Sequence, residues 1–413
     1  GFNQKLKQKN ITEFVINMSQ ERNYLKEIES IKIEITDKHS KYMKTYNSYI
    51  DKLTEKNSFI NRNKNRTKSK QMKSLLIASA LIIVGSCAET KQSTKTNTLK
   101  NTTQIIDSKL ILEYCKTITP KDLKDRLSVF ASEEFKGRGT GTKGQKTATN
   151  YLRDFYKTKG ILPAINDSTY YQTIPADFLP KDIGTSENVL AYIKGSEKPD
   201  EVLIISGHLD HLGVEDKTIH FGADDNGSGS IAITEIAEAF KIAELNGHSP
   251  KRSILFLHLT AEEIGLQGSK FYIENPIFKL NKTIANLNID MVGRVDETHE
   301  ENPEYLYIIG ADRISKELHN ISEKTNETFT NLELDYKYNA ENDKNRYYYR
   351  SDHYNFAQQN IPVIFYFNGE HKDYHKPTDT EDKINYPLLA KRTKLIFATA
   401  WQLANKKDFL ITN

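Results

Sequence analysis

The sequence predicts an α/β fold, a three-layer α/β/α sandwich with a mixed, mostly parallel central sheet. Apolar runs of strand length occur at 188–194, 201–206, 253–259, 283–289, 305–309 and 361–366. Helical patterns alternate with them at 145–159, 230–244, 267–274, 313–325 and 387–405. This alternation favours a parallel sheet. Strands that are apolar on both faces indicate helices on each side of it. We expect one folded domain, from 105 to 410.

Two segments that connect the predicted elements have unusual compositions. The stretch 221–229 is rich in Asp, Asn and Gly and directly precedes the helix predicted at 230–244. The stretch 331–350 is polar and rich in Tyr, without a clear period, so we expect an irregular excursion near a site there.

Three segments precede the predicted domain. Residues 1–71 hold 16 Lys and Arg against 8 Asp and Glu. We expect them to be upstream sequence read through by a wrong gene start at 1 instead of Met72, with a charged helical extension as the alternative. In 72–86 a short basic start leads into an apolar run and then into small residues before Cys87. As a helix this run would span about 20 Å, too short for a hydrocarbon core of roughly 30 Å. It is typical of a signal peptide.

The residues before Cys87 resemble the lipobox of bacterial lipoproteins. The signal would direct export, and cleavage before Cys87 with acylation of its thiol would anchor the protein to a bacterial membrane. Residues 87–104 would be a flexible tether. An ordinary secretory signal is the alternative.

With Cys87 acylated, Cys115 would be the remaining cysteine, so no disulfide is expected. Without 1–86 the chain has 41 basic and 47 acidic residues, a net charge of −6, which indicates no nucleic-acid partner. No obligate protein partner is evident.

Side chains that can bind metal follow three of the predicted strands. They are His208, Asp210, Glu262, Glu263 and Asp290. Ligands collect at the carboxyl ends of strands in open α/β sheets, and imidazole with carboxylate is a ligand set that suits zinc. Asp210 is placed to hold the second ring nitrogen of His208. Taken singly, each of these residues has a structural explanation.

Adjacent carboxylates point to cations. Asp224 and Asp225 repel each other unless a cation lies beside them, although a helix-capping turn explains them as well. Glu262 and Glu263 leave their turn in different directions, so one can bind metal while the other faces a substrate. His375 precedes the last long helix.

The combined set suits two divalent ions that share one carboxylate. The five predicted ligands are His208, Asp224, Glu263, Asp290 and His375. Glu262 is left over as the proton acceptor that a metal-activated water needs. His211 is assigned to structure or to the rim, and His258 to the core. The run 351–353 either borders the pocket or caps a helix.

Several other chemistries are excluded by missing motifs. The chain has no His-Glu-x-x-His helix and no Gly-x-Ser-x-Gly elbow. It also lacks the Gly-x4-Gly-Lys-Ser/Thr phosphate loop.

Four motifs resemble the signatures of the M28 zinc peptidases, a family that includes di-zinc bacterial aminopeptidases. They contain Gly222 to Asn226, Glu262 to Ser269, Asn288 to Met291, and the pair Tyr374 and His375. The resemblance covers about 127–384.

The resemblance implies two Zn²⁺ per chain. His208 and Asp290 would hold one ion, Glu263 and His375 the other, and Asp224 would bridge them. Glu262 would be the general base and Tyr374 an oxyanion stabiliser. A cis peptide is expected between Asp224 and Asp225.

The implied activity is hydrolysis of peptide bonds, with release of N-terminal residues as the leading expectation. A carboxypeptidase or dipeptidase on the same site, and an acyltransferase of the glutaminyl-cyclase type, are the alternatives.

Overall fold

The computed structural model describes residues 104–166 and 168–413. The expectations for 1–71, for 72–86 and for Cys87 concern residues outside this described part. Among the helices of the described residues, none combines the length and the apolar character needed to cross a membrane.

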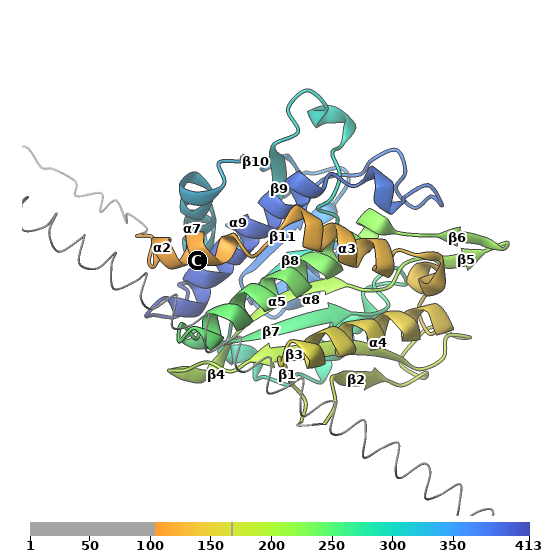
Figure 1. Ribbon diagram of the computed structural model, residues 1–413, viewed down its shortest axis with the longest axis horizontal. Helices are drawn as coiled ribbons and strands as arrows, with labels where there is room; N and C mark the ends of the chain where they lie inside the picture. Colours follow the sequence, from red (N-terminus) through yellow and green to blue (C-terminus); the bar gives the residue numbers. More distant parts are fainter. Residues whose placement is uncertain (1–103, 167) are drawn as a thin grey trace, which may run out of the picture. The chain divides into compact units, whose positions relative to one another are not determined.

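The central sheet has nine strands in the order β1-β3-β7-β4-β8-β11-β9-β10, with β2 beside β3 (Figure 1). The bounds are β1 Leu162–Pro163, β2 Tyr171–Ile174, β3 Ser186–Ile193, β4 Lys198–His208, β7 Arg252–Leu259, β8 Thr283–Ile289, β9 Tyr305–Ile309, β10 Glu333–Asp335 and β11 Val363–Phe367. The neighbouring strands β7, β4, β8 and β11 run parallel. Strands β3 and β9 are antiparallel to β7 and β11. The mixed sheet with a parallel centre confirms the predicted fold class.

Helices pack on both faces of this sheet. They are α2 Ser108–Cys115, α3 Pro120–Phe130, α4 Lys143–Thr158, α5 Gly229–Leu245, α6 Gln267–Glu274, α7 Lys316–Phe329, α8 His353–Ala357 and α9 Tyr386–Asn405. Shorter helical segments, of three to six residues, are η1 Glu133–Arg138, η2 Ala223–Ser228, η3 Leu280–Lys282, η4 Glu297–His299, η5 Lys337–Asn339, η6 Tyr347–Tyr349 and η7 Glu381–Lys383. A separate hairpin joins β5 Gly213–Glu215 to β6 Thr218–His220.

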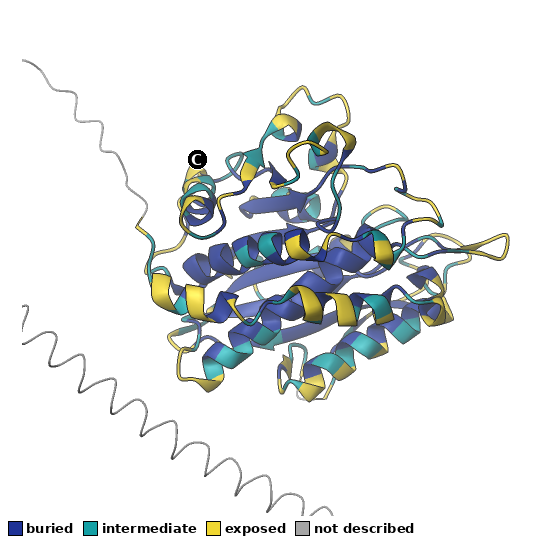
Figure 2. Cartoon of the chain, turned by 45° about the horizontal axis from the view of Figure 1, so that its top comes forward, coloured by how far each residue is buried: buried dark blue, intermediate teal, exposed yellow. Residues whose placement is uncertain are grey.

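Alternate residues of β4 show how the layers form. Leu203 and Ile205 lie in the core cluster shared with α3, α5 and α9. Val202 and Ile204 lie in a second cluster, with residues of α6 and α8. Successive side chains of a strand point to opposite faces, so an uninterrupted apolar run buries both faces at once. Figure 2 shows the buried sheet between helices whose outer sides are exposed.

Helices α5 and α9 form the centre of the larger helical layer. The Phe240 ring of α5 packs against Phe397 and Trp401 of α9, with centroids 4.8 and 5.7 Å apart. Helix α9 begins where the Asn385 side chain accepts a hydrogen bond from the Leu388 amide. Pro387 occupies the first turn, where its missing N–H leaves no bond unmade.

The predicted elements agree with the observed ones to within a few residues, and β8, β9 and α6 have the predicted bounds. Helices α2 and α3 and strands β1, β2, β5, β6 and β10 were not predicted, whereas α8 begins at the run 351–353, where a helix start was considered. Helix α3 buries Leu123, Leu127 and Phe130 at helical spacing. The stretch 331–350 is largely irregular, as expected, with a short strand and two single turns.

The parallel centre of the sheet decides where a site can form. Strands β4, β7, β8 and β11 all end at the same edge, and Ser206 of β4 pairs with Asn288 of β8. The loops that follow these strands therefore meet, as expected for an open α/β sheet.

Candidate metal centre

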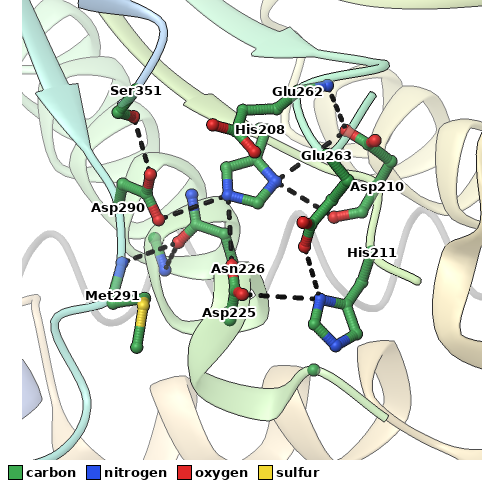
Figure 3. Close-up of polar contacts among 12 residues, drawn as sticks. His208, Asp210, His211, Asp225, Asn226, Glu262, Glu263, Asp290, Met291 and Ser351 are labelled. Atoms are coloured by element: carbon green, nitrogen blue, oxygen red, sulfur yellow. Dashed lines mark hydrogen bonds and ion pairs between the residues drawn. The ribbon is translucent and has the colours of Figure 1, made fainter. Parts of the chain in front are cut away.

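His208 and Asp290 meet at the edge where β4 and β8 end (Figure 3). His208 Nε2 lies 3.2 Å from Asp290 Oδ1 and 3.3 Å from Asp225 Oδ1. In a tetrahedral zinc site with bonds of about 2.0–2.1 Å, two ligand atoms lie roughly 3.3 Å apart. All three side chains are buried. The three atoms therefore have the spacing of ligands around one ion.

A second set of ligand atoms lies on the other side of Asp225. His375 Nε2 is 3.1 Å from Asp225 Oδ2 and 3.2 Å from Glu263 Oε2. Asp225 thus presents one oxygen to each histidine, which is the arrangement of a carboxylate shared by two ions. Burial alone would raise the pKa of Asp225. The hydrogen bonds from His208 and His375 outweigh it and hold this pKa well below its usual value.

The expectation that Asp224 is the shared carboxylate is wrong, because Asp225 occupies that place. The Asp224 carboxylate accepts hydrogen bonds from Ser228 Oγ at 2.8 Å and from the Gly293 amide at 2.7 Å. Its other oxygen lies 3.2 Å from His371 Nε2. The two aspartates are adjacent in a tight turn where Asp225 has extended φ and ψ, so their side chains point in different directions.

The cis peptide is also displaced by one residue from its expected place. It joins Asp225 to Asn226, not Asp224 to Asp225. The Asn226 side chain donates to the Ile289 carbonyl and accepts from the amides of Gly229 and Met291. These bonds tie the turn that carries Asp225 to the end of β8.

The Asp379 carboxylate also holds the turn that carries Asp224 and Asp225. Asp379 Oδ2 accepts hydrogen bonds from the amides of Asp224 and Asp225, at 2.9 and 3.1 Å. Arg294 Nη1 lies 3.7 Å from Asp379 Oδ1, and His371 Nε2 lies 4.0 Å from it. Neither Asp379 nor His371 was singled out from the sequence, and no sequence motif distinguishes a carboxylate that binds amides from one that binds metal.

A chain of hydrogen bonds between side chains of β4, β8 and Ser351 orients the Asp290 carboxylate. Ser351 Oγ donates to Asp290 Oδ2 at 2.6 Å and accepts from Asn288 Nδ2 at 2.8 Å. Ser206 Oγ in turn donates to Asn288 Oδ1 and accepts from Asn286 Nδ2. The run 351–353 therefore borders the site, and α8 receives no side-chain cap from it.

Asp210 supports the neighbouring residues in a different way from the one expected. The second ring nitrogen of His208, Nδ1, lies 3.1 Å from the Asp210 backbone carbonyl and 3.8 Å from its carboxylate. The carboxylate instead accepts bonds from the Glu262 amide at 3.2 Å and from Thr140 Oγ1 at 2.8 Å. Burial raises the pKa of Asp210, and His208 opposes that shift.

Glu262 and Glu263 diverge as predicted. Glu263 faces His375, whereas Glu262 lines the pocket and has a carboxylate oxygen within 4.8 Å of ligand atoms of His208 and Glu263. Burial raises the pKa of Glu262 well above its usual value; His208 opposes this, and Glu263 adds to it.

Tyr374 covers the outer side of His375. Its ring lies parallel to that imidazole, with centroids 3.9 Å apart. Its hydroxyl is 3.4 Å from Arg350 Nη2. Burial raises the pKa of Tyr374 far above its usual value, so at neutral pH the hydroxyl keeps its proton and can donate it in a hydrogen bond.

A buried arginine clamps the loops that carry the ligands. Arg138, in η1, donates from Nε to the Leu209 carbonyl at 2.9 Å and from Nη2 to the Gly222 carbonyl at 2.6 Å. Its Nη1 donates to the carbonyls of Phe221 and Phe130. The loop after β4 and the turn before Asp225 are thereby held by one guanidinium.

His258 is a core residue, as predicted, and its Nε2 lies 2.6 Å from the Tyr156 hydroxyl.

These residues fit the proposed pair of cations. Four carboxylates gather around His208 and His375, namely Asp225, Glu262, Glu263 and Asp290. Buried carboxylates are costly unless they are paired or bind a metal. Mixed imidazole and carboxylate donors suit zinc.

The sequence pattern of peptidase family M28 matches residues 188–400, just over half of the chain. The chain is 31% identical over 252 residues to leupeptin-inactivating enzyme 1 of Streptomyces exfoliatus, which covers 61% of this chain and 48% of that enzyme. The chain covers half or less of the length of the curated relatives that it matches.

Two solved structures share the fold. The LapA aminopeptidase of Legionella pneumophila superposes with a TM-score of 0.57 at 21% identity, covering 74% of this chain and 77% of that one. The glutaminyl cyclase of Bacteroides thetaiotaomicron gives a TM-score of 0.52 at 18% identity, covering 70% and 99%.

The two adjacent aspartates make a matched pair for testing the site. Asp225→Asn should bind less zinc than the wild type, because an amide cannot supply an anionic oxygen to each ion. Asp224→Asn should keep the wild-type zinc content, because its amide oxygen can still accept from Ser228 and Gly293. Zinc per chain, measured by mass spectrometry after dialysis, separates the two. Equal loss in both variants would contradict the placement.

Proposed function

The chain belongs to peptidase family M28, and from this premise we propose that it is a di-zinc peptidase that releases N-terminal residues from peptides. The observation that carries the proposal is the Asp225 carboxylate, which lies between His208 and His375 with one oxygen toward each. Around it the site supplies one further carboxylate to each histidine. His208, Asp225 and Asp290 would hold one zinc ion, and His375, Glu263 and Asp225 the other.

The chemistry that zinc supplies when bound is Lewis acidity, which acidifies water and polarises a carbonyl group. Glu262 has an oxygen within 4.8 Å of ligand atoms of His208 and Glu263, but the 3.1–3.3 Å contacts of the two histidines are with other carboxylates. We assign it the proton transfers: with cations bound beside it to favour its ionised form, its carboxylate would accept a proton from the attacking water and pass it to the nitrogen of the departing amine. The Asp210 carboxylate fixes Glu262 by accepting its amide hydrogen.

Tyr374 is assigned to the carbonyl oxygen of the scissile bond. Its hydroxyl stays protonated and lines the same pocket as Glu262. A donor already in place when negative charge develops on that oxygen stabilises the transition state more than the ground state.

The charges of the pocket support an aminopeptidase over the carboxypeptidase alternative. Beyond the metal ligands, its carboxylates are Glu262, which can attract a substrate ammonium group, and Glu370, which is paired with Arg350. The one guanidinium of the pocket lining, Arg350, is already paired with Glu370 at 2.9 Å. A substrate carboxylate would therefore compete with Glu370 for Arg350.

An apolar wall supports preference for an apolar N-terminal residue. The wall consists of Met291, Tyr347, Phe365 and Phe367, which share one buried cluster and line the pocket. Apolar contacts of this kind discriminate between side chains by about 1–3 kcal/mol per methylene.

We further propose that the enzyme is exported and held at a bacterial membrane by a lipid on Cys87. The support is the sequence of 72–87, with its basic start, short apolar run and small residues before the cysteine.

The role of Glu262 is tested by Glu262→Gln, which keeps the shape and removes the base. We expect turnover to fall at least 100-fold, within the range usual for loss of a general base, while both zinc ions stay bound. The control is Glu370→Gln at the rim, which should keep kcat within about tenfold of wild type. A Glu262→Gln enzyme with more than a tenth of wild-type kcat would refute the assignment.

Substrate class is tested with aminoacyl 4-nitroanilides and their N-acetylated forms. The free-amine substrates, leucine above the charged residues, should be cleaved about 100-fold faster than the blocked ones. Equal rates would contradict an aminopeptidase while leaving a peptidase. An N-terminal glutamine that lost ammonia, without release of the residue, would indicate acyl transfer of the glutaminyl-cyclase kind.

The lipid anchor is tested by growing bacteria that express the full chain with labelled palmitate. The wild type should carry label and sediment with membranes, whereas Cys87→Ser should do neither. An unlabelled wild type would exclude the anchor.

A further inference from the structure

His211, which the sequence analysis assigned to structure or to the rim, lies beside the candidate metal ligands Glu263 and Asp225. It follows Asp210 in the loop between β4 and β5 and is buried. Figure 3 shows its ring directed at Glu263 and Asp225. No role for it has entered the proposed reaction.

The distances distinguish a hydrogen bond from a pair of metal ligands. His211 Nδ1 lies 2.8 Å from Glu263 Oε1, the length of a hydrogen bond, and 3.6 Å from Asp225 Oδ2. His375 Nε2 is 3.1–3.2 Å from its two carboxylate neighbours. Two ligands of one zinc ion lie roughly 3.3 Å apart. His375 therefore has ligand spacing, and His211 has the spacing of a hydrogen-bond donor.

The contact also decides where the imidazole proton lies. A carboxylate that binds a cation is ionised and can only accept hydrogen bonds. The nitrogen that faces Glu263 must then be the protonated one. Within the described residues His211 Nε2 has no hydrogen-bond partner, so nothing there competes for the proton.

We propose that His211 is a positioning residue for the second zinc ion. Its Nδ1–H engages Glu263 Oε1, so that Oε2, which lies 3.2 Å from His375 Nε2, is the oxygen presented to that ion. Hydrogen bonds to the far side of a metal ligand fix its orientation and tune its affinity. The proposal rests on the proposed di-zinc function and adds a residue that sets how tightly the second zinc ion is bound.

The surrounding structure holds the ring in this orientation. A Cβ at Gly222 would lie 2.5 Å from both Cγ and Cδ2 of His211, so only glycine leaves room for the imidazole. Arg138 anchors the Gly222 carbonyl, and Gly139 pairs with the His211 backbone. The His375 ring meets His211 edge-on at 5.8 Å.

The second ion is the one that needs such help. The side chains of the first ion's ligands are at most 10% exposed, and Asp290 is aimed by Ser351. The His375 side chain is 39% exposed. Loss of His211 should therefore affect one ion and spare the other.

The experiment compares zinc binding to the metal-free wild type, His211→Leu and His211→Asn, by titration against a chromophoric chelator. His211→Leu removes the donor, whereas the side-chain amide of His211→Asn places an N–H close to the position of Nδ1. We expect His211→Leu to bind the first ion as the wild type does and the second about 10–100-fold more weakly. His211→Asn should recover most of that loss.

Two results would overturn the proposal. One is a His211→Leu protein that binds both ions with wild-type affinity, which would leave the residue a packing role. The other is an Asn variant as weak as the Leu variant, which would show that the histidine itself binds metal. The readout is independent of hydrolysis: a wild type that binds two ions but cleaves no aminoacyl amide would refute the proposed function alone.

Discussion

The structure depends on keeping a dense group of carboxylates together where little water reaches them. Asp225, Glu262, Glu263 and Asp290 converge on His208 and His375 at the edge of the sheet. Ionised carboxylates in such a place repel one another and lose hydration, at a cost of several kcal/mol per ion unless cations compensate. Divalent ions between the carboxylates would compensate this negative charge. The repulsion that destabilises the carboxylates without cations would therefore strengthen the binding of cations.

Arginines placed behind the site supply positive charge without entering it. Arg138 and Arg392 are fully buried, and each binds backbone carbonyls of loops that carry ligands. Burial lowers the pKa of each to about 10, and nearby carboxylates oppose the shift, so both remain charged at neutral pH. A guanidinium has five donors in a fixed geometry, so it can hold several carbonyls at once. Charge compensation and loop placement are thus combined in the same side chains.

The two proposed ion positions are unequal. One is formed by side chains at strand ends and is reinforced by the chain of bonds through Ser351, Asn288 and Ser206. The other includes His375, which lies on a loop after β11, has a φ of 55° and is partly exposed. Loops of this kind open more readily than strand ends. Tyr374 stacks on His375 at this more exposed position.

Much of the scaffold could be read from the chain alone. Uninterrupted apolar runs in β4, β7 and β8 indicate strands buried on both faces, and parallel strands bring their carboxyl ends to one edge. Those two facts were enough to predict the sheet and to bring His208, Glu263 and Asp290 together. The polar supports could not be predicted in this way, because they act on residues distant in sequence: Arg138 and Asp379 bind backbone atoms, and His371 faces the Asp224 carboxylate.

The adjacent residues Asp224 and Asp225 show most clearly what the sequence determined and what only the tertiary structure decided. Sequence determined that carboxylates and imidazoles follow the strands, because residue type and strand period are local properties. The tertiary structure decided that Asp225 and not Asp224 faces the histidines, because that choice depends on the backbone angles of one turn and on the amides that Asn226 and Asp379 bind. It decided in the same way that His211 points at Glu263, since only the glycine at 222, across the loop, leaves space for its ring.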